Sequence, residues 1–87
     1  MKTIVYAITD PMGLHARPAG LLVKKAASFQ SSITVKNVGT GKTVDAKRIM
    51  GVMSLGVKQG NEIELSIEGD DEENAQEALS VFLKENL

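Results

Sequence analysis

A single histidine, followed two residues later by an arginine, is the segment of this chain best suited to chemistry. The histidine is His15, and Arg17 and Pro18 follow it closely. Proline is favoured in the first turn of a helix, where its missing N–H costs no hydrogen bond. A helix is therefore predicted to begin near Pro18, with His15 at or next to the N-cap. The free amides of Ala16 and Arg17 would then point outward near the imidazole.

A helix start of this kind binds anions, phosphate in particular, and the guanidinium of Arg17 can hold phosphate oxygens in a bidentate manner. The positive helix end and Arg17 also disfavour a protonated ring, so we expect His15 to be largely neutral at about pH 7. A neutral ring has the lone pair that a nucleophile needs, and the same donors would meet the phosphate after transfer. His15 is therefore predicted to accept a phosphoryl group and pass it on.

Three other interpretations of His15 remain open from its sequence position. It could be a capping or surface histidine, with Arg17 as a solvated charge. Acid–base catalysis is a second possibility, although the sequence pairs no carboxylate with His15. A metal centre is less favoured, because the chain has no cysteine and no second histidine to share the ion. We expect neither a metal nor a cofactor.

Hydrophobic periodicity predicts how this segment is held. The last helix is the firmest element, because it combines acids in its first turn, a cap at Asp70 or Asp71 and one apolar stripe from Ala75 to Leu83. The other predicted elements are strands at 3–8, 32–37, about 43–44 and 62–68, a helix from Pro18 to about Ser28, and a short helix within 47–55.

The predicted fold class is α+β. The strands alternate between apolar and polar residues, as in an antiparallel or mixed sheet with one wet face and one face covered by helices. We therefore expect an open-faced β-sandwich of order β-α-β-β-α-β-α, with a four-stranded antiparallel sheet and the helices on one side. Residues 1–87 are expected to form a single domain.

Bulk composition is ordinary for a globular protein, with 43% hydrophobic and 24% charged residues. The absence of cysteine excludes a disulfide scaffold and allows a reducing compartment. The apolar start is too short for a secretory signal, and no stretch approaches a membrane span. We expect a cytoplasmic protein that binds neither membrane nor nucleic acid and is a monomer.

The net charge of −1 conceals a strong asymmetry along the chain. Residues 1–60 contain nine basic and two acidic residues, whereas residues 61–87 contain one basic and nine acidic residues. A basic front would direct the molecule toward acidic partners or anionic ligands. The alternative is that folding mixes these charges over the surface.

Two separated motifs resemble the HPr family, the histidine-containing phosphocarriers of the bacterial phosphoenolpyruvate:sugar phosphotransferase system. The first runs from Gly13 to Ala19 (GLHARPA), and the second from Lys47 to Gly56 (KRIMGVMSLG). Length, predicted element order and the C-terminal amphipathic helix also fit, so the resemblance covers essentially the whole chain.

The resemblance implies that enzyme I phosphorylates His15 on Nδ1 and that the group passes to the A domain of a sugar-specific enzyme II. Arg17 corresponds to the arginine that supports the phosphate, and Pro18, with Gly13, shapes the turn. The family docks partners through its first two helices. The docking candidates are Gly20, Lys24, Arg48, Ile49, Met50 and Met53, an apolar and basic set suited to partners with acidic rims. Of Met50 and Met53, we expect one to be exposed and one to be buried.

The chain departs from the regulated members of the family at Arg48, which occupies the position of a serine that a dedicated kinase phosphorylates. Arginine has no hydroxyl and carries the opposite charge to phosphoserine. We predict that this control and the linked corepressor role are absent. Nothing in the sequence indicates that Ser54 substitutes.

The leading hypothesis is therefore a phosphocarrier that its partner enzymes turn over, and not a stand-alone catalyst. A rival hypothesis is an HPr-like regulatory module that signals phosphorylation state by docking, without sugar transport. A third hypothesis is an anion-binding domain whose His15 is never modified.

Overall fold

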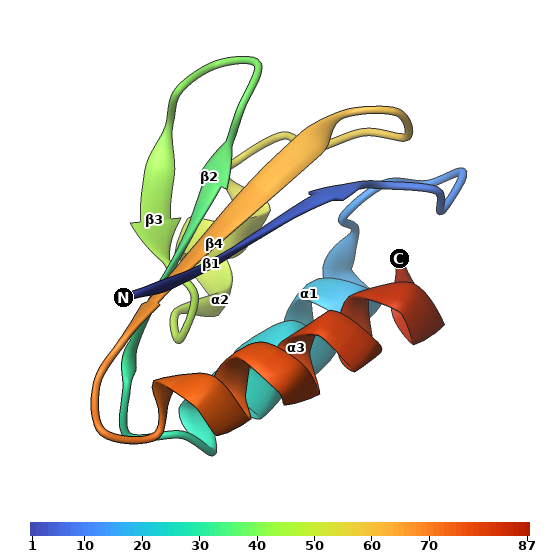
Figure 1. Ribbon diagram of the computed structural model, residues 1–87. Coiled ribbons are helices and arrows are strands. Elements are labelled where there is room, and N and C mark those ends of the chain that lie inside the picture. The colour runs from blue at the N-terminus through green and yellow to red at the C-terminus, as the bar shows by residue number, and fades with distance from the viewer.

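The computed structural model describes residues 1–87 as a four-stranded sheet with three helices on one face (Figure 1). The order of the strands across the sheet is β1-β4-β2-β3, and every neighbouring pair is antiparallel. This confirms the predicted α+β class and the order β-α-β-β-α-β-α. The elements are β1 (Lys2–Ala7), α1 (Ala16–Ala27), β2 (Ser32–Asn37), β3 (Thr43–Asp45), α2 (Ile49–Met53), β4 (Glu62–Glu68) and α3 (Glu72–Asn86).

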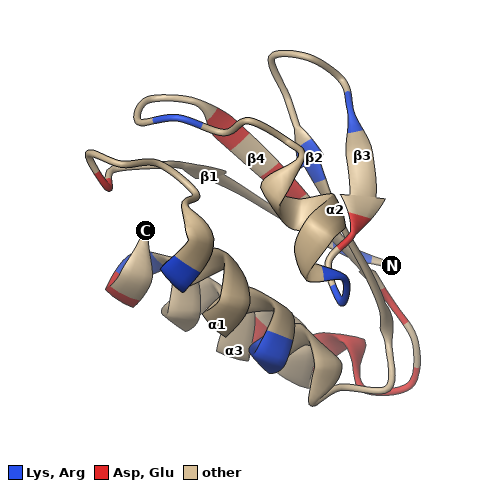
Figure 2. Cartoon of the chain, turned by 180° about the vertical axis from the view of Figure 1, so that it is seen from behind, with Lys and Arg blue, Asp and Glu red and all other residues tan.

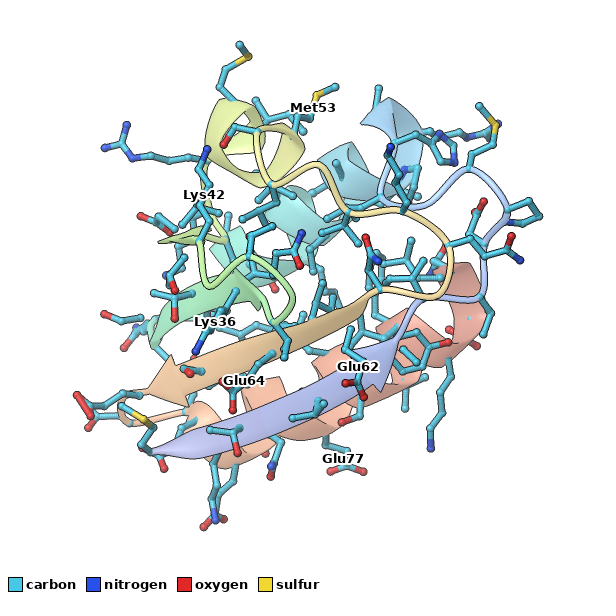
Figure 3. The ribbon with its side chains drawn as sticks, turned by 90° about the horizontal axis from the view of Figure 1, so that it is seen from above. Lys36, Lys42, Met53, Glu62, Glu64 and Glu77 are labelled. Atoms are coloured by element: carbon cyan, nitrogen blue, oxygen red, sulfur yellow. The ribbon has the colours of Figure 1, made fainter.

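Strand register gives the sheet its two different faces. In the central strands, Val35 pairs with Leu65 and Ile33 with Ile67, and all four side chains point into the core. On the other face, Lys36 lies opposite Glu64 on the neighbouring strand (Figure 3). Because side chains alternate along a strand, the period of two in the sequence was sufficient to predict this arrangement.

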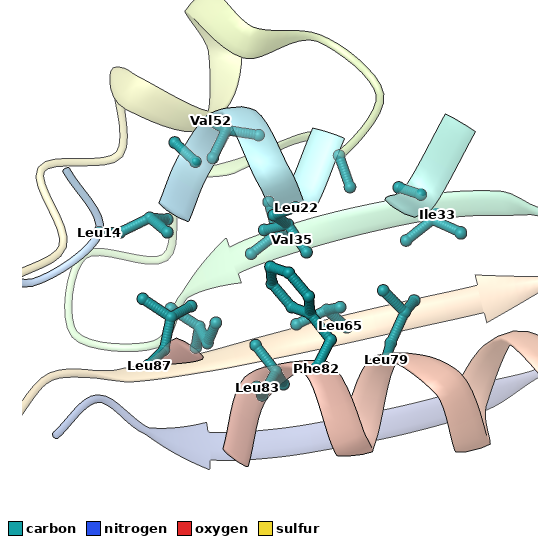
Figure 4. Close-up of a cluster of buried hydrophobic side chains, with 14 of the residues drawn as sticks. Leu14, Leu22, Ile33, Val35, Val52, Leu65, Leu79, Phe82, Leu83 and Leu87 are labelled. Carbon is teal, nitrogen blue, oxygen red and sulfur yellow. The ribbon is translucent and has the colours of Figure 1, made fainter. Parts of the chain in front are cut away.

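The core lies between the sheet and the pair α1 and α3. Its large side chains come from every layer, and Leu22, Leu65 and Leu79 have no exposed surface (Figure 4). Burial of each such side chain contributes about 1.5–3 kcal/mol, which offsets the entropy lost by ordering the chain. None of the helices is both long enough and apolar enough to cross a bilayer.

The start of α3 matches the prediction in position but not in its side-chain bonding. Asp71 is the N-cap residue, as predicted, but its side chain makes no capping hydrogen bond. Instead, the carboxylate accepts hydrogen bonds from the backbone of Gln30 and Ser31 and from the Ser31 hydroxyl. The carboxylate therefore holds a distant loop and not the first turn of its own helix. These bonds hold the pKa of Asp71 below its ordinary value, with the Ser31 hydroxyl as the main cause.

Candidate functional site

His15 is the N-cap residue of α1, as predicted. Its backbone is extended, with φ −86° and ψ −177°, and its carbonyl accepts a hydrogen bond of 3.0 Å from the Ala19 amide. The imidazole makes no capping hydrogen bond and is 32% exposed. The ring therefore does not cap the helix and is accessible from solvent.

The loop before His15 lies directly against another part of the backbone. The Leu14 amide donates to the Val57 carbonyl at 3.1 Å, and the Leu14 side chain is buried. Gly13 has φ +69°, and a Cβ atom there would lie 2.4 Å from the Val57 oxygen and 2.7 Å from the Lys58 Cα. Only glycine fits both the left-handed backbone and the close approach. Gly13 thus fixes the point from which α1 starts.

The first turn of α1 presents unused hydrogen-bond donors. Neither the Ala16 amide nor the Arg17 amide donates to an acceptor within the chain, and Pro18 has no amide hydrogen. The exposed Arg17 side chain makes no hydrogen bond or ion pair within the chain either. The first turn contains no acid. Two amides and a guanidinium are therefore available to an anion next to the imidazole.

An open cavity of about 310 Å³ lies beside these donors. His15 and Arg17 both line it, so the structure brings together the two residues that the sequence singled out. The complete lining is Asp10, His15, Arg17, Pro18, Leu21 and Asn86.

The structure adds a carboxylate that the sequence analysis did not pair with His15. Asp10 Oδ2 lies 3.6 Å from His15 Nε2, because the turn at 10–13 folds the chain back on itself. Proline and glycine mark that turn in the sequence, but they do not fix where the Asp10 side chain points. The imidazole therefore has a carboxylate near Nε2, and the same cavity is lined by Arg17. The neutral state of His15 stays a prediction.

The predicted docking residues of α2 lie on its outer face. Met50 is 78% exposed, Met53 44% and Ile49 37%, whereas Val52 is the one buried residue of the helix. Figure 3 shows the Met53 side chain directed away from the sheet. The expectation that one of the two methionines would be buried was wrong, because a helix of five residues has room for only one inward side chain.

The docking residues of α1 extend the same surface, since α1 packs beside α2. Lys24 is exposed, and Gly20 is half-buried with no heavy atom near the position that a Cβ would take. Position 20 is therefore a shallow place on the surface of α1.

Basic and acidic residues gather on different elements of the molecule. Figure 2 shows basic residues on α1 and on the loop before α2, and acidic residues on β4 and on the loop before α3. Within the sheet, Lys36 lies opposite Glu64. The asymmetry along the chain is therefore retained between elements and is offset locally where strands of opposite charge pair.

Arg48 is the N-cap residue of α2, and its side chain makes no capping hydrogen bond. Its Nε lies 3.9 Å from Asp45 Oδ2, with both side chains well exposed. The Ser54 hydroxyl, six residues later, donates to the Gly51 carbonyl at 2.6 Å. The absence of serine control stays a prediction.

The fold and the site together define a class of protein. An accessible histidine at a helix N-terminus, with free amides and a guanidinium beside it on an open-faced β-sandwich, is typical of a site that receives an anion. The family model described as the PTS HPr component phosphorylation site matches residues 2–85. The chain belongs to the HPr family, and it is a phosphocarrier of the phosphotransferase system.

Two HPr proteins are similar to this chain over nearly its whole length. The phosphocarrier protein HPr of Lysinibacillus sphaericus is 47% identical over 85 residues, which cover 98% of this chain and 94% of that protein. The crystal structure of HPr-C-His from Thermoanaerobacter tengcongensis is 50% identical, with a TM-score of 0.91, and the match covers 99% of this chain and 94% of that one.

A further relative is Crh, the catabolite repression protein of Bacillus subtilis, solved as a dimer with a swapped domain. It is 40% identical, with a TM-score of 0.75, over 94% of this chain and 92% of that one. Family membership implies enzyme I and enzyme IIA domains as partners.

Proposed function

We propose that His15 is the residue that carries the phosphoryl group, received from enzyme I and delivered to the enzyme IIA domains of sugar transport systems. The observation that carries the proposal is the accessible imidazole at the start of α1, next to two amides without acceptors and an unpaired guanidinium. The resemblance supports Nδ1 as the acceptor atom. Residues 1–87 act as one domain that its partners turn over.

The chemistry needs little from the protein except position and charge. The Nδ1 lone pair attacks phosphorus, the bond from phosphorus to the donor breaks, and the donor keeps that electron pair. The phosphoryl oxygens then face the Ala16 and Arg17 amides and the Arg17 guanidinium, which need no rearrangement. Onward transfer is the same displacement in the opposite sense, with the imidazole as leaving group.

The surface that meets both partners is formed by α1 and α2. Three large apolar side chains of α2 are exposed, although such groups are more often buried, and Lys24 of α1 and Arg48 before α2 are exposed as well. An apolar centre with basic surroundings suits partners with acidic rims. The predicted docking set is Gly20, Lys24, Arg48, Ile49, Met50 and Met53.

A regulatory interaction module is the second candidate, because Crh is 40% identical to this chain, although that identity is below the 47% and 50% of two HPr proteins. Both candidates retain a phosphorylated His15, so assays with enzyme IIA domains separate them. We propose that the free chain is a monomer, a state that sedimentation measurements test against a swapped dimer.

Mass spectrometry after incubation with phosphoenolpyruvate, Mg²⁺ and enzyme I tests the carrier role. The wild-type chain is expected to gain one acid-labile phosphoryl group and to lose it to an enzyme IIA domain. His15→Ala is expected to gain none. If the wild-type chain gains no mass from an enzyme I that phosphorylates another HPr, the proposal is wrong.

Arg17 is expected to affect the rate of transfer and not the capacity for it. Loss of one charged hydrogen-bonding group from an exposed site slows transfer about tenfold. Arg17→Ala should therefore still be labelled, but more slowly in rapid-quench experiments, and Arg17→Lys should recover part of the rate. The matched control is Lys84→Ala, which removes an exposed cation near the end of α3.

A further inference from the structure

The Asp10 carboxylate is fixed in place beside the imidazole. One oxygen, Oδ1, accepts a hydrogen bond of 2.8 Å from the Met12 amide, and the other, Oδ2, lies 3.6 Å from His15 Nε2. The Asp10 side chain is 25% exposed. The loop therefore occupies one oxygen of this carboxylate and leaves the second facing the ring.

The backbone of Asp10 is held as firmly as its side chain. Its amide donates to the Leu87 carbonyl at 2.9 Å, and its carbonyl accepts from the Gly13 amide at 2.9 Å. The neighbouring Thr9 adds two more bonds to the same Leu87 oxygen, from its amide at 2.6 Å and its hydroxyl at 2.8 Å. The carboxylate is thus oriented before any partner binds, as a group that orients a catalytic ring must be.

A neutral imidazole has one N–H and one lone pair, and the groups around the ring determine which nitrogen has which. A carboxylate next to Nε2 attracts the N–H to that nitrogen and leaves the lone pair on Nδ1. The 3.6 Å separation is too long for a hydrogen bond, so the effect in the free protein is electrostatic. Arg17 is the other charged side chain that lines the cavity, and a cation offers no acceptor for the ring N–H, so Asp10 is the one charged acceptor there.

We propose that Asp10 is a positioning residue that holds the proton of His15 on Nε2. This inference rests on the proposed function of His15 and extends it. With the proton on Nε2, the Nδ1 lone pair forms the bond to phosphorus, and the ring gains a positive charge that the Asp10 carboxylate offsets. When the phosphoryl group leaves, the bonding pair returns to Nδ1 and the ring departs neutral, because the Nε2 proton has stayed in place. One fixed carboxylate therefore assists both uptake and release.

The substitution Asp10→Asn tests this directly. An asparagine oxygen can still accept from the Met12 amide, but the group facing the ring becomes an NH₂, which prefers a lone pair on Nε2. Nitrogen-15 spectra of the neutral ring are expected to show the Nε2–H tautomer in the wild type and a shift toward Nδ1–H in Asp10→Asn. Asp10→Ala, with no group there, is expected to give an intermediate mixture.

Transfer kinetics provide the second readout. In Asp10→Asn, kcat for phosphoryl transfer from enzyme I should fall roughly tenfold, which corresponds to a loss of about 1.4 kcal/mol of transition-state stabilisation. KM should change little, because Asp10 is not among the docking residues. Asp10→Glu should recover part of kcat. Asp70→Asn is the control, since it neutralises an exposed carboxylate next to the start of α3 that faces no histidine and no docking residue.

The outcomes separate the two proposals. If Asp10→Asn and Asp10→Ala both keep the wild-type tautomer and the wild-type kcat, the role of Asp10 is wrong and the carrier role of His15 stands. If the tautomer shifts in Asp10→Asn but enzyme I phosphorylates neither the wild type nor the variants, the carrier role fails and the positioning effect stands. Circular dichroism identifies an unfolded variant, and Asp10→Glu then carries the kinetic comparison.

Discussion

Two helices in this molecule begin in different ways. Before each start, a glycine with positive φ packs against distant backbone: Gly13 against Val57 and Lys58, and Gly69 against Ser31. Beyond that point the two starts differ. The first turn of α1 contains no acid and leaves amides free, whereas that of α3 contains two acids.

The acids at the start of α3 are used within the chain. Asp71 accepts from the Ser31 hydroxyl and from two amides, and Glu72 accepts from the Gly69 amide and pairs with the N-terminal amine at 3.0 Å. A helix end attracts negative charge, and here the chain supplies that charge itself. At α1 the same attraction is left for a group brought from outside. The contrast distinguishes a structural helix start from a functional one.

The largest effect is expected from removing the anchor of α1. Gly13→Ala forces a Cβ atom into a left-handed backbone and to within 2.4 Å of the Val57 oxygen. Backbone strain and overpacking each cost about 1–3 kcal/mol, so a loss of about 2–6 kcal/mol is expected in urea unfolding. Transfer from enzyme I should fall as well, since the His15 loop must shift.

Gly41→Ala is the control for this prediction. Gly41 also has positive φ, +78°, but no heavy atom lies within 4 Å of its would-be Cβ. It should therefore lose only the strain component, about 1–3 kcal/mol, and less than Gly13→Ala. Equal losses for the two variants would mean that the contact with Val57 is not what fixes the loop.

The second prediction makes the start of α1 resemble that of α3. Ala16 is exposed in the first turn of α1, so Ala16→Glu should fold and place a carboxylate over the free amides. This carboxylate competes with the phosphoryl group for the same donors, and phosphorylation by enzyme I should slow about tenfold in rapid-quench assays. Ala27→Glu, at the exposed last residue of the same helix, adds the same charge away from the site. Similar slowing in both variants would attribute the effect to net charge.

Sequence patterns predicted which residues begin the two helices, but not which partners their nearby carboxylates meet. Periodic apolar residues indicated the strands and the stripe of α3, and the proline placed His15 at the start of α1. The partners of the Asp10 and Asp71 carboxylates were not predictable from such patterns, because each carboxylate meets them only after the chain has folded back. Asp71 bonds to residues 40 and 41 positions away, and no local pattern encodes such a contact.

The sequence pattern also did not predict which side chains of α2 are buried. Methionine is equally suited to a core and to a docking surface, and periodicity assigns no orientation to a helix of one turn. Only packing against α1 and β3 determines that Val52 points inward and both methionines outward. The candidate site was therefore predictable where it depends on local backbone chemistry, and not where it depends on tertiary contacts.

The smallest effect is expected at the start of α3, and it depends on pH. Hydrogen bonds to the charged carboxylate hold the pKa of Asp71 in the folded state below its unfolded value, so the ionised group stabilises the fold. This contribution is complete above the unfolded pKa of about 3.9 and is lost as the pH falls through the lowered folded pKa. Asp71→Asn should therefore lower the urea midpoint at neutral pH and approach the wild type in acid.

Asp70→Asn is the neighbouring control, since Asp70 makes no hydrogen bond or ion pair through its side chain. Its urea midpoint should follow that of the wild type at every pH. Asp71 lies at the start of α3, whereas the cavity beside His15 is lined by Asn86 at the other end of that helix. Neither variant should therefore change the rate of phosphorylation by enzyme I. A slower rate in Asp71→Asn would show that the two helix starts are coupled, and the division into a structural and a functional start would then fail.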